Sequence, residues 1–126
     1  MEGKCRIDFI PTKRRSRSTR TGHHYSHPKN EQEASAIRAA YTGGLHEGAV
    51  EINIETFGKL PNGTPKKITS EVNIRKPDAD NTAKAILDAL NGVAFKDDRY
   101  VVKLTVTKNP RVRCECEYTT FEVVDA

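Results

Sequence analysis

The chain has no tryptophan, one methionine and three cysteines, and aromatic residues make up only 6% of its 126 residues. An odd, small number of cysteines argues against the disulfide framework of small secreted proteins. Mean hydropathy is −0.68, and no apolar run approaches the roughly 20 residues that a helix needs to cross a bilayer. The N-terminal residues lack the long apolar segment of a signal peptide. These absences predict a cytoplasmic protein without membrane spans.

What is present is a charged chain with few large apolar side chains. Hydrophobic residues account for 36% of the sequence and charged residues for 30%. The length fits a single domain over residues 1–126. A domain of this size buries about two thirds of the surface of its unfolded chain. We therefore expect a thin core, accompanied by a flexible segment or by burial against a partner subunit.

Positive charge is concentrated in the N-terminal quarter. The net charge is +4, but residues 1–30 carry +6 and residues 31–126 carry −2. Residues 11–30 hold six basic residues and no acid, and they have the composition of a long polar loop. Such a patch indicates contact with a polyanion, and nucleic acid is a better candidate than a membrane surface. A solvated, disordered arm is the simpler alternative. The candidate phosphate contacts in this loop are Lys13, Arg14, Arg15, Arg17 and Arg20.

Periodicity predicts the order β-α-β-β-α-β-β. Alternating apolar residues predict strands at 5–10, 49–57 and 68–74, and a pair at 100–107 and 111–123 around a turn at Lys108–Pro110. A helix is expected over 29–41 with Asn30 as its N-cap. The clearest helix runs from Asp78 to Asn91, with an apolar stripe on one face. The prediction is a single α+β domain whose mixed sheet has mostly hairpin-joined strands and both helices on one face.

Acidic residues gather around this second helix. Asp78 and Asp80 lie at its start, where Pro77 keeps the preceding chain extended. Lys84 follows one turn later, and Asp97 and Asp98 precede the next strand. If that strand pairs beside the one ending at Arg75, the carboxylates converge. Carboxylates without histidine or cysteine suit Mg²⁺, which supports phosphodiester hydrolysis.

Simpler explanations exist for each of these residues. Asp78 or Asp80 could cap the helix, Asp97 and Asp98 could form an ordinary turn, and Asp80 with Lys84 could be a solvated ion pair. Only one aspartate can occupy the N-cap, however. The basic residues around the acids also suit phosphate, namely Arg75, Lys76 and Lys96.

Two further groups could bind metal. The histidines at 23, 24 and 27 do not have zinc spacing, and an exposed or DNA-facing loop explains them better. Cys114 and Cys116 are expected on one face of a strand, where two buried cysteines are a better explanation than zinc.

The ordered run Lys76-Pro77-Asp78-Ala79-Asp80-Asn81, Lys84, Asp88–Gly92 and Lys96-Asp97-Asp98 resembles the RusA family of Holliday junction resolvases, which phages and prophages often carry. The strong match covers residues 70–107. Thr82 replaces a frequent leucine, and Lys13–Arg17 departs from the family's usual N-terminal run.

The resemblance implies a homodimeric endodeoxyribonuclease of mixed α/β fold that cuts two opposed strands of a four-way junction with Mg²⁺ or Mn²⁺. Carried over by position, Asp78, Asp80 and Asp98 match the metal-binding catalytic acids, and Asp97 is the neighbouring acid. Lys84 matches the essential lysine. A twofold dimer would present two sites to two symmetry-related strands.

The predicted function is therefore a magnesium-dependent crossover junction endodeoxyribonuclease acting in DNA recombination and repair. A non-catalytic basic nucleic-acid-binding protein is the alternative, in which the acids merely cap a helix. A metal-dependent phosphatase acting on a small substrate is a second alternative, and it would not need residues 12–27.

Overall fold

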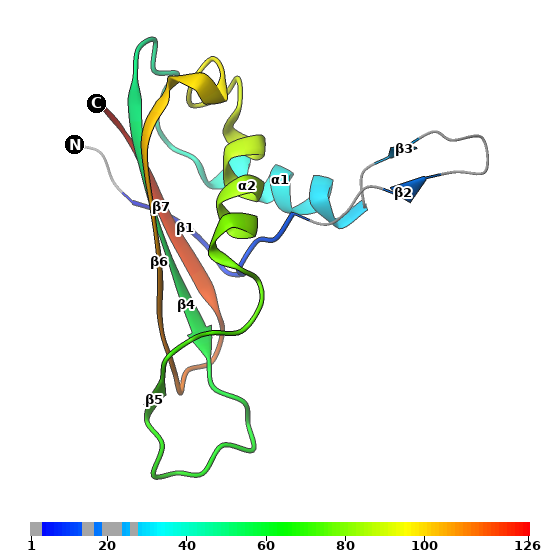
Figure 1. The fold of residues 1–126 in the computed structure, drawn as a ribbon, viewed down its shortest axis with the longest axis vertical. Coiled ribbons are helices and arrows are strands. Elements are labelled where there is room, and N and C mark those ends of the chain that lie inside the picture. Colours follow the sequence, from blue (N-terminus) through cyan, green and yellow to red (C-terminus); the bar gives the residue numbers. More distant parts are fainter. Residues whose placement is uncertain (1–3, 14–16, 19–23, 26–27) are drawn as a thin grey trace.

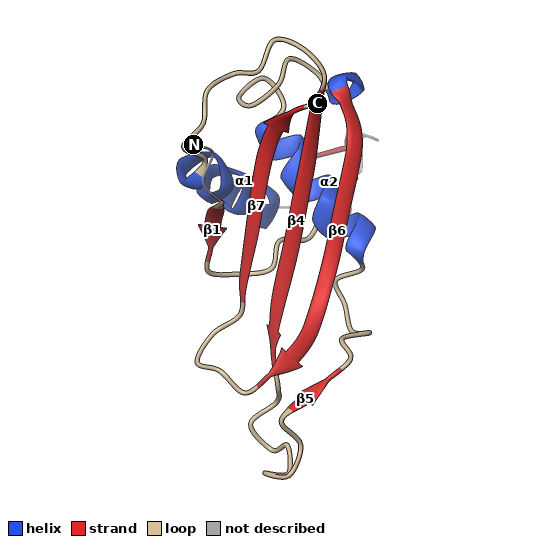
Figure 2. Cartoon of the chain, turned by 90° about the vertical axis from the view of Figure 1, so that its left-hand side faces the viewer, coloured by secondary structure: helices blue, strands red, loops and turns tan. Residues whose placement is uncertain are grey.

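The computed structural model describes residues 4–13, 17–18, 24–25 and 28–126. Five strands form one mixed sheet in the order β1-β7-β4-β6-β5, and two helices lie on one of its faces (Figures 1 and 2). The main elements are β1 (Cys5–Ile7), α1 (Pro28–Ala40), β4 (Val50–Lys59), β5 (Ser70–Glu71), α2 (Ala79–Leu90), η1 (Asp98–Tyr100), β6 (Val101–Val112) and β7 (Tyr118–Asp125). The predicted single-domain α+β architecture with helices on one face is confirmed.

Strand β4 is the centre of the sheet. Its residues alternate between buried and half-buried, and Ile52 and Ile54 are fully buried. β4 pairs antiparallel with β7 and parallel with β6. Between β4 and β6 the chain passes through α2, which supplies the long crossover that parallel neighbours require. Helix α2 is therefore held against the sheet by the strands on either side of it in the sequence.

The core lies between the helices and the sheet. Ile37 of α1 and Ile86 and Leu90 of α2 are completely buried, together with Phe95 just beyond α2. The apolar stripe predicted for 78–91 is therefore the packed face of α2. The predicted N-cap at Asn30 is wrong, because α1 already begins at Pro28. Proline suits the first turn of a helix, where its missing N–H has no intrahelical partner.

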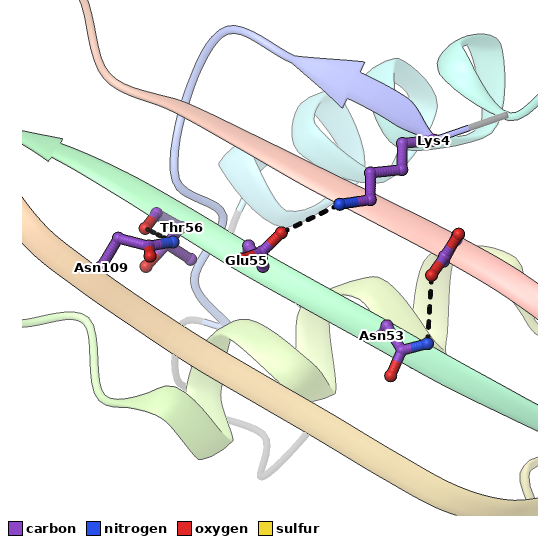
Figure 3. Close-up of polar contacts among 6 residues, drawn as sticks. Lys4, Asn53, Glu55, Thr56 and Asn109 are labelled. Carbon is purple, nitrogen blue, oxygen red and sulfur yellow. Dashed lines mark hydrogen bonds and ion pairs between the residues drawn. The ribbon is translucent and has the colours of Figure 1, made fainter.

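The other face of the sheet carries polar contacts, and no helix of the described residues covers it (Figures 2 and 3). Lys4 Nζ lies 3.2 Å from Glu55 Oε2, and Asn53 Nδ2 donates to Glu122 Oε1 at 3.1 Å. The Asn53–Glu122 bond joins the neighbouring strands β4 and β7. The Lys4–Glu55 contact instead reaches from the residue before β1, across β7, to β4 (Figure 3). The candidate catalytic residues Asp78, Asp80, Lys84 and Asp98 all lie elsewhere, along α2 and the segment that follows it.

The expectation of hairpin-joined strands is wrong. In the sheet, β4 lies between β6 and β7, and β6 lies between β4 and β5. Local periodicity cannot distinguish a hairpin from a crossover, since both present the same alternation of side chains. A hairpin does occur between β2 (Arg17–Ser18) and β3 (His24–Tyr25), inside the segment predicted as a loop.

The expected turn at Lys108–Pro110 is also wrong, because β6 runs through it to Val112. The pairing between β4 and β6 shifts register between Phe57 and Lys59, opposite Pro110. Proline is tolerated in a strand at such an irregularity, where its missing N–H breaks no ladder bond. The real turn follows β6, so Cys114 and Cys116 lie in a loop, half-buried and exposed, and not buried on a strand.

The strand expected at 68–74 is reduced to the two residues of β5. The chain then continues as a connector, residues 72–77, to the start of α2. Val72 and Ile74 are 74% and 88% exposed, so their alternation does not reflect burial against the helices. Among the described residues, no helix is long and apolar enough to span a membrane.

Candidate functional site

Helix α2 presents its polar residues opposite the packed stripe. Asp78 takes the N-cap position with an extended backbone (ψ 154°), but its side chain makes no capping hydrogen bond. Asp80, in the first turn, and Lys84, one turn further, are both exposed. Thr82 is buried, in agreement with a packing role at the position where the RusA family often has leucine.

The carboxylates of Asp78 and Asp80 have no protein partner among the described residues. Within the described part of the chain, neither side chain takes part in a hydrogen bond or ion pair, and the Lys84 ammonium group has no such partner either. The simpler explanations, a side-chain cap by Asp78 and an ion pair between Asp80 and Lys84, are therefore not what the structure shows. A helix N-terminus favours negative charge, so both carboxylates are available to an external ligand.

Asp98 lies at the other end of α2. It opens η1, and its Oδ1 accepts a hydrogen bond from Asn91 Nδ2 at 3.2 Å. Burial raises the pKa of the Asp98 carboxyl, and the negative charges of Asp88 and Asp97 raise it further. Asp97 is exposed beside it.

The predicted convergence of the acids within one chain does not occur. Asp78 and Asp98 are separated by the 12 residues of α2, or about 18 Å at 1.5 Å per residue. Oxygen ligands of Mg²⁺ lie about 2.1 Å from the ion, so these two cannot share one. Accordingly, the described residues contain no group of three or more metal-ligating side chains.

The physical reason is the position of β5. The prediction required the strand before Arg75 to pair with the start of β6, near Asp98. In the structure β5 pairs with the far end of β6, Ser70 opposite Val112 and Glu71 opposite Arg111. The chain therefore reaches α2 from the end of the sheet away from Asp98.

Asp78 and Asp80 nevertheless fit a divalent cation on their own. Mg²⁺ in phosphate chemistry is commonly held by one or two carboxylates, with substrate phosphate and water completing its coordination. Two exposed, unpartnered aspartates at one helix end satisfy that requirement. The set of three acids from a single chain does not.

Basic residues frame the start of α2. Arg75 and Lys76 are exposed, and neither side chain has an ion-pair partner within the described residues. The connector is fastened to β6 where Lys108 Nζ donates to the Arg75 carbonyl oxygen at 2.5 Å, and β5, just before the connector, is fastened where Arg111 pairs with Glu71. Sequence reasoning missed Lys108 and Arg111, because the turn expected at 108–110 hid their position on a long strand beside the connector.

The remaining predicted contacts are divided between the ends of α2 and the N-terminal segment. Lys96 is exposed near Asp97. Lys13 forms an ion pair with Asp88 at 2.8 Å, so part of its charge is already neutralised. The side chain of Arg17 in β2 lies outside the described part, as do several other predicted residues, namely Arg14, Arg15, Arg20, His23 and His27.

Comparison with known proteins identifies the chain's relatives. Residues 8–117 match the family described as endodeoxyribonuclease RusA. The uncharacterized protein YqaN of Bacillus subtilis (strain 168) is 36% identical over 77 residues, which are 52% of this chain and 54% of YqaN. The match thus spans about half the length of this curated relative. The family match, in contrast, extends over most of the sequence, and the chain belongs to the RusA endodeoxyribonuclease family.

Proposed function

We propose that this protein is a divalent-metal-dependent endodeoxyribonuclease that resolves four-way DNA junctions in recombination and repair. The observation that carries the proposal is the pair of unpartnered carboxylates, Asp78 and Asp80, at a helix N-terminus directly after two exposed basic residues. Membership of the RusA family supports the activity class.

Each residue near the start of α2 has a role in this proposal. Asp78 and Asp80 would hold the metal ion, Mg²⁺ or Mn²⁺. When bound, such an ion activates a water molecule and neutralises charge at the scissile phosphate. Lys84, one turn from Asp80 and without a hydrogen-bond or ion-pair partner in the described part of the chain, would stabilise the negative charge that develops on the phosphate.

Arg75 and Lys76 would bind the DNA backbone next to the metal. Backbone contacts of this kind position a protein on nucleic acid without reading its sequence. The N-terminal basic residues would add further phosphate contacts, although Lys13 contributes less while it is paired with Asp88. We expect a homodimer, because a resolvase cuts two strands related by the symmetry of the junction.

The decisive experiment is a gel assay with a synthetic mobile four-way junction and a linear duplex of the same sequence, with and without Mg²⁺. We expect paired cuts in the junction, little cleavage of the duplex and no cleavage in EDTA. Asp80→Asn should abolish cleavage while keeping or improving junction binding. Glu47→Gln is the matched control, because Glu47 is exposed and has no ion-pair partner among the described residues.

Failure of the wild-type protein to cut the junction in either metal would contradict the proposal. If the protein still bound branched DNA, it would be a non-catalytic nucleic-acid-binding protein. Cleavage by the wild type that persists in Asp80→Asn would remove the assigned role from Asp80.

A further inference from the structure

A second concentration of positive charge lies at the end of the sheet away from Asp98. Residues 59–76, from the last residue of β4 to the connector, hold five basic residues and one acid. The acid is Glu71, which is already paired with Arg111. The loop between β4 and β5 projects beyond this end of the sheet (Figure 1). The net charge of −2 over residues 31–126 therefore conceals a basic surface that sequence reasoning missed.

Two lysines occupy the central positions of a tight turn in this loop. The Ile68 N–H donates to the Pro65 carbonyl oxygen at 3.0 Å, which closes a β-turn around Lys66 and Lys67. We call residues 65–68 the lysine turn. Both lysines are exposed, and neither side chain has an ion-pair or hydrogen-bond partner within the part of the chain that the structure describes. Turns favour glycine, proline, asparagine, aspartate and serine, so turn formation does not account for these lysines.

Arg113, just beyond β6, holds the lysine turn at both of its ends. Its guanidinium group donates to the Pro65 carbonyl oxygen at 3.2 Å and to the Ile68 carbonyl oxygen at 3.1 Å. Carbonyl partners do not neutralise its charge, and among the described residues no carboxylate lies within ion-pair distance of it. Three positive charges are thus held close together without compensation. Because like charges repel, an anion would stabilise this arrangement.

The lysine turn lies along the same edge as the cations proposed to bind DNA at the start of α2. Lys108 holds the Arg75 carbonyl, and Arg113 follows Lys108 by five residues, or about 17 Å at 3.3 Å per residue of strand. Phosphates of one DNA strand are about 3.4 Å apart along the duplex axis, so the separation corresponds to about five base pairs. A duplex that follows this edge would meet both groups of cations.

The chemistry of this surface suits the backbone of a duplex better than unpaired bases. Residues 59–76 contain no aromatic residue, whereas proteins that bind single strands stack the bases on aromatic side chains. The aromatic pair beside this segment is occupied: Phe57 and Tyr118 stack on each other at 4.4 Å between ring centroids, and Arg6 lies over the Tyr118 ring. The side chains that remain are lysine and arginine, which bind phosphate without reading sequence.

We propose that the lysine turn and Arg113 bind the phosphate backbone of one duplex arm, about five base pairs from the phosphate at Asp78 and Asp80. This contact would fix the direction in which that arm leaves the cutting site and would take no part in the reaction. The binding of duplex stands on the geometry and charge of the turn. Its distance from the cut rests, in addition, on the proposed nuclease function.

The salt dependence of binding to a linear duplex tests the contact without any cleavage. In EDTA, fluorescence anisotropy between 50 and 300 mM NaCl compares the wild type with the double variant Lys66→Gln/Lys67→Gln. Loss of two phosphate contacts should make the slope of the logarithm of the binding constant against the logarithm of the salt concentration shallower by about 1.8. Binding at 0.1 M salt should weaken by more than about tenfold.

The matched control removes the same charge elsewhere. In Lys4→Gln/Arg38→Gln both substituted residues are already paired with carboxylates, so the slope should change little. An unchanged slope in the lysine-turn variant, or equal changes in the two double variants, would overturn the proposal. The lysine-turn variant should melt like the wild type, because exposed residues without partners contribute little to stability.

Photo-crosslinking locates the lysine turn on the DNA with a different variant. In a Cys114→Ser, Cys116→Ser background, Lys66→Cys is labelled with an azidophenacyl group, while the remaining Cys5 is buried. On a four-way junction in EDTA we expect crosslinks in duplex about five base pairs from the position that the wild type cuts in Mg²⁺. Thr107→Cys, beside Glu55 on the helix-free face, is the control and should give few crosslinks.

Crosslinks at the centre of the junction, or equal crosslinking from both positions, would overturn the assigned contact. A wild type that never cuts, but shows the expected slope and crosslinks to duplex, would contradict the nuclease function and support the duplex contact. A wild type that cuts, with neither the change in slope nor the crosslinks, would overturn the duplex contact alone.

Discussion

The side-chain amide of Asn91 donates a 3.2 Å hydrogen bond to Asp98, and this contact ties Asp98 to the C-terminal end of α2. Asn91 is also the C-cap residue of that helix, and its backbone N–H bonds to the Leu87 carbonyl. The bond therefore holds the acid at the end of α2 opposite Asp78. In a single chain, the helix that carries Asp80 and Lys84 thus also keeps Asp98 away from them.

The environment of Asp98 predicts how stability depends on pH. Burial and the charges of Asp88 and Asp97 raise the pKa of its carboxyl in the folded protein. Between the ordinary aspartate pKa of about 3.9 and the raised value, the folded chain holds a proton that the unfolded chain has released. Stability conferred by this group therefore falls as pH rises through that window.

Asp98→Asn should accordingly raise the free energy of unfolding near neutral pH, and the gain should shrink as pH falls toward 4. Urea denaturation at fixed protein concentration across pH 3.5–7.5 measures the gain in unfolding free energy and its dependence on pH. Glu47→Gln, at an exposed carboxyl, should show no such gain. A gain that grows with acidification would mean that the pKa of Asp98 is lowered by folding.

The core of α2 gives a second prediction. Ile86 is completely buried against the sheet, and truncating such a side chain costs about 2–5 kcal/mol. Ile86→Ala should lower the free energy of unfolding by that amount. Ile74→Ala, at a residue that is 88% exposed, should change it by less than about 0.5 kcal/mol. Similar losses at both positions would show that the connector is buried in solution.

Much of the fold could be predicted from local patterns. The apolar stripe of residues 78–91 located α2, and strict alternation located β4, because each pattern reflects burial on one side. The N-terminal position of Asp78 and Asp80 on α2 followed from Pro77 in the same way. These features depend on residues that are close together in the sequence.

The arrangement of strands could not be predicted in this way. Whether β6 joins β4 or β7, and at which end β5 meets β6, is decided by packing between residues far apart in the sequence. Pro110 was misread as a turn because only the shifted register opposite Phe57 and Lys59 makes room for it in a strand. The misplaced end of β5 then brought Asp98 too close to Asp78 in the predicted site.

The two ends of α2 should differ in their contribution to DNA binding. The logarithm of the binding constant falls linearly with the logarithm of the salt concentration. Removing one basic residue that contacts a phosphate makes this slope shallower by about 0.9 on duplex DNA. Lys76 is exposed and has no ion-pair partner in the described structure, so Lys76→Gln should show about this change. Lys13→Gln should show a smaller one, because Asp88 lies 2.8 Å from the Lys13 ammonium group.

Junction binding measured by fluorescence anisotropy between 50 and 300 mM NaCl gives both slopes. Lys4→Gln is the control, because Lys4 is paired with Glu55 on the open face of the sheet (Figure 3). A larger change in slope for Lys13→Gln than for Lys76→Gln would show that the principal DNA contact lies in the N-terminal segment and not in the connector.

Lys108 is expected to position the connector without touching substrate. Its ammonium group donates to the Arg75 carbonyl, three residues before Asp78. Lys108→Met removes this tether but keeps most of the side-chain volume. Because misplacement of a reacting group by about 1 Å can cost up to 100-fold in rate, we expect kcat for junction cleavage to fall about tenfold or more, with KM nearly unchanged.

Lys108→Arg keeps a donor at this position and should recover most of the lost rate. Manganese binding followed by calorimetry on the protein without DNA provides a second readout, since a displaced Asp78 should weaken the ion's affinity in Lys108→Met alone. A fall in unfolding free energy that accounts for the lost rate would indicate a purely structural role. A raised KM with unchanged kcat would instead make Lys108 a direct DNA contact, since its charge would then serve binding and not the placement of Asp78 and Asp80.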